Sequence, residues 1–233
     1  MEKKTKPIKP AQFAESEIVK AIISNQWTAG HKLPPERELA ELIGVTRPTL
    51  REVLQRLSRD GWLTISHGRP TIVNDYKRNG GLGVFKTIVN YDEFSPINII
   101  RDWLEFRVLI LPSLAQKAVT INPKQIISKL KEAPSVDSES VIFAAFDWEI
   151  QMLLVMLSNN SIAKMLYNDL TNIYKKQGSI YFENHSTKEK SLRYYEKLKV
   201  NIIENKNISL IVKDSMSESL DIWLKNYSII NNN

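Results

Sequence analysis

Glycine and proline are concentrated in the front third of this 233-residue chain. Seven of the eight glycines lie between residues 30 and 83, and no proline follows Pro134. Because both residues interrupt regular structure, turns crowd the front, and the rest of the chain is free to form long helices. The distribution predicts a mostly α-helical protein with a small, turn-rich front domain and an all-helical bundle behind it.

Hydrophobic periodicity locates the helices of the bundle. They are expected over residues 97–119, 123–132, 138–158, 161–182, 187–205 and 208–227. The helix over 138–158 is apolar on most of two faces, including Ile142 and Leu153, so it needs packed neighbours on both. The predicted organisation is a front domain over 1–76, a linker with a short helix over 77–95 and the bundle over 96–233.

The front domain has the pattern of a helix-turn-helix unit. Its helices are expected over residues 11–25, 36–43 and 47–60. In the second helix Leu39 and Leu42 are expected to face inward, and Thr46 is a suitable N-cap for the third. Two short helices joined by a three- to four-residue turn are typical of DNA-binding proteins.

A β-hairpin is expected after the third helix. Residues 62–66 alternate apolar and polar side chains, and a second extended run covers residues 71–73. Gly68 can adopt a positive φ at the tip, between His67 and Arg69. The hairpin is therefore predicted to be a small wing whose tip meets a minor groove or its phosphates.

The positive charge of the chain belongs to the front domain. The net charge is +6, and residues 1–78 hold 14 basic and 9 acidic side chains, a local excess of five. Seven of the ten arginines lie there, and the arginine fork suits phosphates and base edges better than the lysine point charge does. A double-stranded DNA partner is expected.

The N-terminal end of the third helix gathers the side chains best suited to DNA. Thr46, Arg47, Thr49 and Arg51 cluster there, where free backbone N–H groups and the positive end of the helix dipole also favour phosphate. We expect this end to enter the major groove.

The sequence lacks the residue clusters that catalysis or metal binding would need. The chain has no cysteine, and its three histidines, at 31, 67 and 185, are dispersed, so neither a catalytic cluster nor a metal site is predicted. Asp147 and Glu149 are two residues apart and cannot share a helix face, so they are interpreted as structural or solvated carboxylates. Because no signal peptide or long apolar run is present, a cytoplasmic protein is expected. Because no catalytic cluster is predicted, the protein is not expected to be an enzyme or to need a cofactor. An enzyme targeted to DNA is the less favoured alternative.

The segment GHKLPPERELAELIGVTR, residues 30–47, resembles the winged-helix signature of the GntR family of transcription regulators. The longer run LIGVTRPTLREVLQRLSRDGWLTISHGRPTIV is similar to the fatty-acid-responsive members of that family. The resemblance implies DNA contacts from Arg37, Thr46, Arg47, Thr49, Arg51, His67 and Gly68, and the wing places Arg69 beside them. Pro48 departs from the family pattern, which has threonine there.

The resemblance continues more weakly through the back half. It implies a homodimer and a bundle that binds long-chain acyl-CoA through Leu104, Arg107, Tyr181, Lys213, Met216, Ser219 and Trp223. On a helix Ser219 and Trp223 are one turn apart and share a face with Met216, as one wall of a ligand site requires. Met216 stands where the pattern has glycine, so its side chain would oppose close approach of a ligand.

The function implied by the resemblance is control of fatty-acid metabolism genes. A dimer would bind a palindromic operator and repress degradation genes. Binding of acyl-CoA would release the dimer from the operator. Activation of synthesis genes would be a second role. The alternative is a DNA-binding regulator whose bundle dimerises but has lost or changed the acyl-CoA response.

Overall fold

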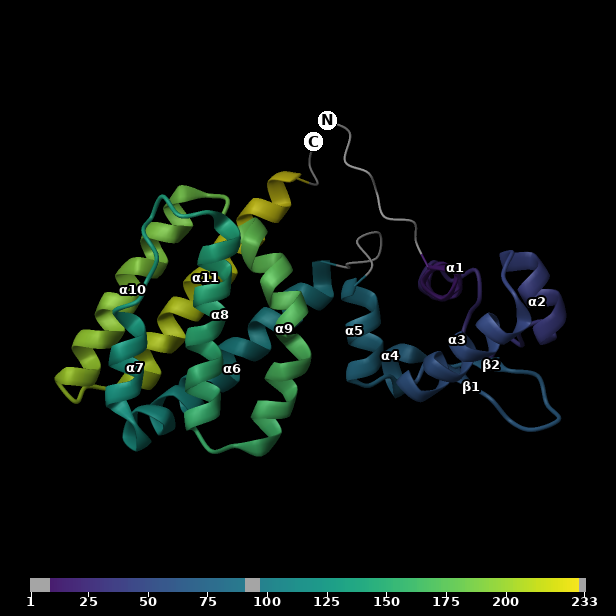
Figure 1. The fold of residues 1–233 in the computed structure, drawn as a ribbon, viewed down its shortest axis with the longest axis horizontal. Helices are drawn as coiled ribbons and strands as arrows, with labels where there is room; N and C mark the ends of the chain where they lie inside the picture. Colours follow the sequence, from purple (N-terminus) through teal and green to yellow (C-terminus); the bar gives the residue numbers. More distant parts are fainter. Residues whose placement is uncertain (1–8, 91–96, 231–233) are drawn as a thin grey trace. The chain divides into compact units, whose positions relative to one another are not determined.

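The computed structural model describes residues 9–90 and 97–230, and the chain divides into two compact units, Met1–Pro96 and Ile97–Asn233. The described elements of the first unit are α1 (Pro10–Ile23), α2 (Glu36–Ile43), α3 (Arg47–Asp60), β1 (Leu63–Thr64), β2 (Ile72–Val73), α4 (Tyr76–Asn79) and α5 (Leu82–Asn90) (Figure 1). Those of the second are α6 (Ile97–Ile121), α7 (Pro123–Leu130), α8 (Ser140–Leu157), α9 (Ser161–Tyr181), α10 (His185–Ile203) and α11 (Ile208–Ile230). The predicted helices are confirmed to within a few residues at their ends.

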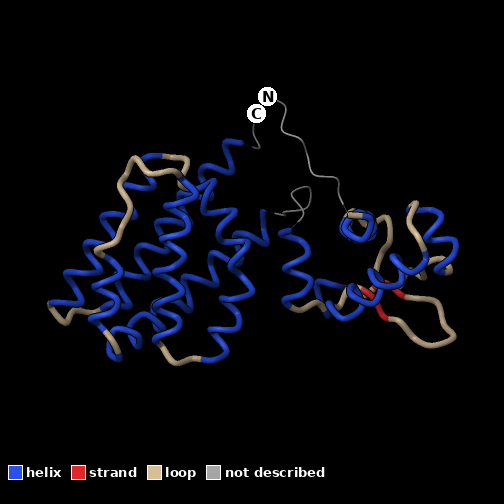
Figure 2. Tube along the Cα trace, in the orientation of Figure 1, coloured by secondary structure: helices blue, strands red, loops and turns tan. Residues whose placement is uncertain are grey.

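In the first unit α1 and α2 both pack against α3. The apolar stripe of α3, with Leu50 and Leu57 fully buried, forms the centre of this core. Thr46 caps α3 as predicted, since its hydroxyl accepts a hydrogen bond from the Thr49 N–H at 3.4 Å. The predicted wing is a two-stranded antiparallel sheet that pairs Leu63 with Val73 (Figure 2). The fold is a winged helix-turn-helix followed by two short helices.

One inward position in α2 was predicted wrongly. Leu39 is buried, but 71% of Leu42 is exposed. The helix is short and directs Leu39 and Ala40 toward α3, whereas Leu42 lies about 60° around the axis from Leu39. The same spacing leaves Leu50 and Val53 of α3 both buried, so the exposure of Leu42 reflects which elements lie beside α2 rather than the spacing itself.

The second unit is a bundle in which α6 packs against α8 and α11, and α8 packs against α9. Phe143, Ile150 and Leu154 of α8 are buried, but Ile142 is 53% exposed, so the expectation of two covered faces fails at the start of this helix. By length and composition α8 passes as a candidate membrane span, the single such helix among the described residues. Half of it is buried within the bundle, where it acts as a core helix.

Candidate functional site

The exposed end of α3 carries the predicted DNA-reading residues. Arg47 is the first residue of the helix, and Arg47 and Arg51 are both exposed on its surface one turn apart. The Thr46 and Thr49 hydroxyls are hydrogen-bonded to each other at 2.8 Å, which fixes the first turn. Arg37 is exposed on α2. Because Leu50, Val53, Leu54 and Leu57 anchor the opposite side of α3, these polar groups are held on a rigid scaffold.

The tip of the wing presents the other three predicted contacts. His67, Gly68 and Arg69 are exposed in the loop between β1 and β2. Gly68 has φ +69°, a left-handed conformation that side-chain-bearing residues rarely adopt, and the Arg69 N–H closes the turn on the Ser66 carbonyl at 3.2 Å. Their role in binding DNA stays a prediction, although the geometry leaves all three free to meet a duplex.

The second unit contains a partly open cavity lined by residues of α6, α8, α9, α10 and α11. It is lined by Ile100, Trp103, Leu104, Arg107, Asp147, Tyr174, Gln177, Gly178, Tyr181, Phe182, Lys190, Ser191, Tyr194, Ser215, Met216, Glu218, Ser219, Ile222 and Trp223. Six of the seven residues that the sequence assigned to an effector are among them. Its volume is about 50 Å³, room for only a few water molecules.

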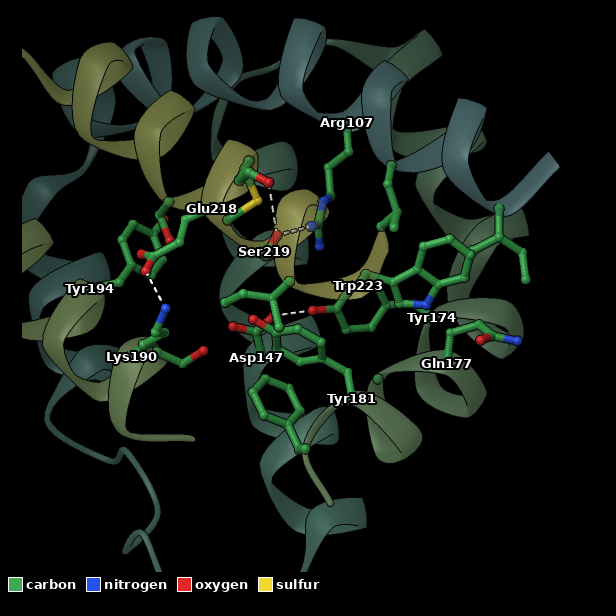
Figure 3. A pocket seen from close by; sticks show the side chains of 18 of the residues that line it. Arg107, Asp147, Tyr174, Gln177, Tyr181, Lys190, Tyr194, Glu218, Ser219 and Trp223 are labelled. Atoms are coloured by element: carbon green, nitrogen blue, oxygen red, sulfur yellow. Dashed lines mark hydrogen bonds and ion pairs between the residues drawn. The ribbon is translucent and has the colours of Figure 1, made fainter. Parts of the chain in front are cut away.

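Arg107 places a buried cation at the wall of this cavity. Its side chain is buried, Nη2 donates to the Ser219 hydroxyl at 2.6 Å, and the guanidinium lies 5.9 Å from the centre of the Tyr174 ring (Figure 3). Nε has no hydrogen-bond partner, and within residues 9–90 and 97–230 no carboxylate forms an ion pair with it. A buried cation without a paired anion is costly, so a polar ligand that accepted its hydrogen bonds would offset part of that cost.

Asp147 anchors a hydrogen-bond network at the base of the cavity. Its Oδ1 accepts from the Tyr195 hydroxyl at 2.5 Å, and its Oδ2 accepts from Gln151 Nε2 at 2.7 Å and from the Tyr174 hydroxyl. Burial and the nearby carboxylate raise the pKa of Tyr174 and of Tyr195 well above the usual value. Both hydroxyls therefore remain protonated and keep donating to Asp147 at any physiological pH.

Lys213, which the family resemblance assigned to the effector set, lies outside the cavity. It is exposed on α11, and its contact with an effector stays a prediction. Conversely, the sequence analysis interpreted Asp147 as a structural or solvated carboxylate and did not single out Trp103 or Tyr174, yet all three line the cavity. A signal for Asp147 existed, since it continues the apolar stripe of Phe143, Ile150 and Leu154.

A winged helix with exposed arginines at the N-terminal end of α3, followed by a helical bundle with an internal cavity, is the architecture expected of a DNA-binding transcription regulator. The model for bacterial regulatory proteins of the gntR family matches residues 10–73, and the model for the FadR C-terminal domain matches residues 74–233. The chain belongs to the FadR group of the GntR family. It is a transcription regulator, not an enzyme.

Similar proteins agree with this assignment. The fatty acid metabolism regulator proteins of Serratia proteamaculans and Yersinia pestis are each 41% identical over 189 residues, which cover 81% of this chain and 79% of the relative. A solved structure of Lar, which controls expression of the Listeria monocytogenes agr system, covers 93% of this chain and 97% of its own with a TM-score of 0.58. At 13% identity that likeness shows the shared fold alone.

Proposed function

We propose that this protein is a homodimer that binds a palindromic operator in the cytoplasm and controls genes of fatty-acid metabolism. Residues 1–76 bind DNA, residues 77–95 link the domains, and residues 96–233 dimerise and take the effector. The proposal of DNA binding is supported mainly by the exposed pair Arg47 and Arg51 at the capped end of α3. A dimer supplies two such ends, which is why the two half-sites should be related by two-fold symmetry.

Selection from random duplexes tests this proposal. The protein is expected to enrich a palindrome with two half-sites about one helical turn apart. Affinity for the selected duplex should fall steeply with salt, with a slope of about −0.9 per phosphate neutralised in a plot of log K against log salt concentration. Equal affinity for every duplex at physiological salt, or no binding, would contradict the proposal.

The effector is a long-chain acyl-CoA that binds in the α6–α11 cavity. Arg107 and Ser219 supply a buried cation and a hydroxyl for the polar end of the acyl chain, and Trp103, Leu104 and Phe182 supply apolar walls. The names of the 41% identical relatives, both fatty acid metabolism regulators, support this class of effector. The alternative, a bundle that only dimerises, is favoured by one observation, the buried Met216 at the cavity wall.

Binding a long acyl chain requires the cavity to open. A volume of about 50 Å³ holds far fewer atoms than such a chain carries. The acyl-CoA therefore binds preferentially to a state in which the walls have moved, and it shifts the population toward that state. If the opened state spaces the recognition helices wrongly for the two half-sites, the same shift releases the operator.

Met216→Ala is expected to tighten binding of long-chain acyl-CoA by about tenfold, because removing a buried side chain creates space that the ligand fills. The same change should lower the free energy of unfolding without ligand by about 2–5 kcal/mol, since it leaves a void. Isothermal titration calorimetry and thermal unfolding measure the two effects. Met165→Ala, at a methionine 60% exposed on α9, is the matched control and should alter neither. Weaker acyl-CoA binding by Met216→Ala would show that Met216 is a ligand contact rather than an obstacle.

A further inference from the structure

Glu36 holds one edge of the Arg51 guanidinium. Arg51 Nε donates to Glu36 Oε1 at 3.3 Å and to Oε2 at 3.1 Å, and Nη2 donates to Oε2 at 2.8 Å. The pair joins the first residue of α2 to the exposed side of α3. Glu36 raises the pKa of Arg51 mainly through these hydrogen bonds, so the guanidinium is a permanent cation.

The contact leaves the other edge of the fork free. A guanidinium has five N–H groups in a fixed plane. Glu36 takes Nε–H and one hydrogen of Nη2, along the side of the group. The hydrogens at the far end, on Nη1 and Nη2, are the pair that reaches the O6 and N7 acceptors of a guanine in the major groove.

We propose that Glu36 is a positioning residue for DNA specificity, which clamps Arg51 so that it reads a guanine of the operator end-on. This role rests on the proposed operator binding. Glu36 acts in two ways: it fixes the orientation of the fork before DNA arrives, and its negative charge opposes use of Arg51 as a general phosphate clamp. The first effect strengthens binding to the correct base, and the second weakens binding to every other duplex.

A purely structural role does not explain the pair. The side chains are 63% and 34% exposed, and ion pairs exposed to this degree contribute little to stability. The contact between α2 and α3 has its own apolar core, in which Leu39, Leu50 and Val53 are fully buried. The consequence of the clamp should therefore appear in sequence discrimination rather than in folding.

Glu36→Gln tests the role in the full-length protein, with the selected operator and a scrambled duplex of equal length measured by fluorescence anisotropy. The variant should bind the scrambled duplex more tightly, while the ratio of operator to scrambled affinity falls by about tenfold, within the range for one bidentate base contact. Glu41→Gln, at an exposed carboxylate of the same helix, is the control. It removes the same charge and should change both affinities equally, with the ratio kept.

A double variant tests whether Glu36 acts through Arg51. In an Arg51→Ala background, Glu36→Gln should leave the ratio unchanged, because no fork remains to be positioned. An unaltered ratio in the Glu36→Gln single variant would overturn the role of Glu36 while operator binding stands. Failure of the unmodified protein to distinguish the two duplexes would overturn operator binding and this role together.

Discussion

Arg47→Ala is expected to weaken binding to the selected operator by about 5- to 150-fold, the effect of losing one bidentate base contact of about 1–3 kcal/mol. Arg47 opens α3 and is exposed beside the Thr46 cap, where its fork can reach a base edge while the backbone N–H groups meet a phosphate. Anisotropy titrations with operator and with duplexes changed at single positions measure the loss. Discrimination should relax at one base pair of each half-site.

Arg59→Ala provides the matched control for this prediction. Arg59 is exposed in the last turn of the same helix, so the variant removes an equal charge from the end expected to lie outside the groove. It should reduce affinity for all duplexes slightly and alike. Equal losses in the Arg47 and Arg59 variants, without any change in base preference, would show that Arg47 acts only through its charge.

Asp147→Ala is expected to lower the free energy of unfolding of the helical bundle by about 3–5 kcal/mol, because several buried donors lose an acceptor at a cost of about 1–3 kcal/mol each. Asp147 is 6% exposed and accepts hydrogen bonds from Tyr174, Tyr195 and Gln151. Without the carboxylate these buried donors lose their acceptor. The thermal midpoint, followed by circular dichroism, should fall by about 6–20 °C.

Glu149→Gln on the same helix separates this network from a general effect of removing a carboxylate. Glu149 is 57% exposed and pairs with Lys129 at 2.8 Å, a surface ion pair of small stabilising effect. Its loss should cost less than about 1 kcal/mol. If the two variants unfolded at the same temperature, the Asp147 network would not be what holds α8, α9 and α10 together.

The fold was largely predictable because its determinants are local. Glycine and proline positions delimit the turns, the α3 stripe identifies its buried side, and Thr46 identifies where that helix begins. Leu42 was placed wrongly because one residue in a two-turn helix is positioned by its neighbours in space as much as by spacing. The prediction that Ile142 is covered was wrong for a similar reason, since the apolar pattern of a helix does not reveal where its neighbours in the bundle end.

Residue spacing alone predicts the candidate site only where it lies on one element, and the six predicted effector residues that line the cavity came from the family resemblance. The α3 and wing residues are close in sequence, so their grouping follows from helix and hairpin geometry. The cavity draws Arg107, Asp147, Tyr174 and Ser219 from four different helices, and periodicity cannot tell which of several buried faces meet. The pairing of Glu36 with Arg51 likewise depends on how α2 packs against α3.

Operator binding and acyl-ligand binding are expected to be coupled within this one protein. The most direct measurement is fluorescence anisotropy of the selected operator bound to the full-length protein, titrated in parallel with a long-chain acyl-CoA and with free coenzyme A. Micromolar acyl-CoA should release the duplex, and coenzyme A alone should leave it bound. An operator complex that is unchanged by acyl-CoA at saturating concentration would contradict the expected coupling.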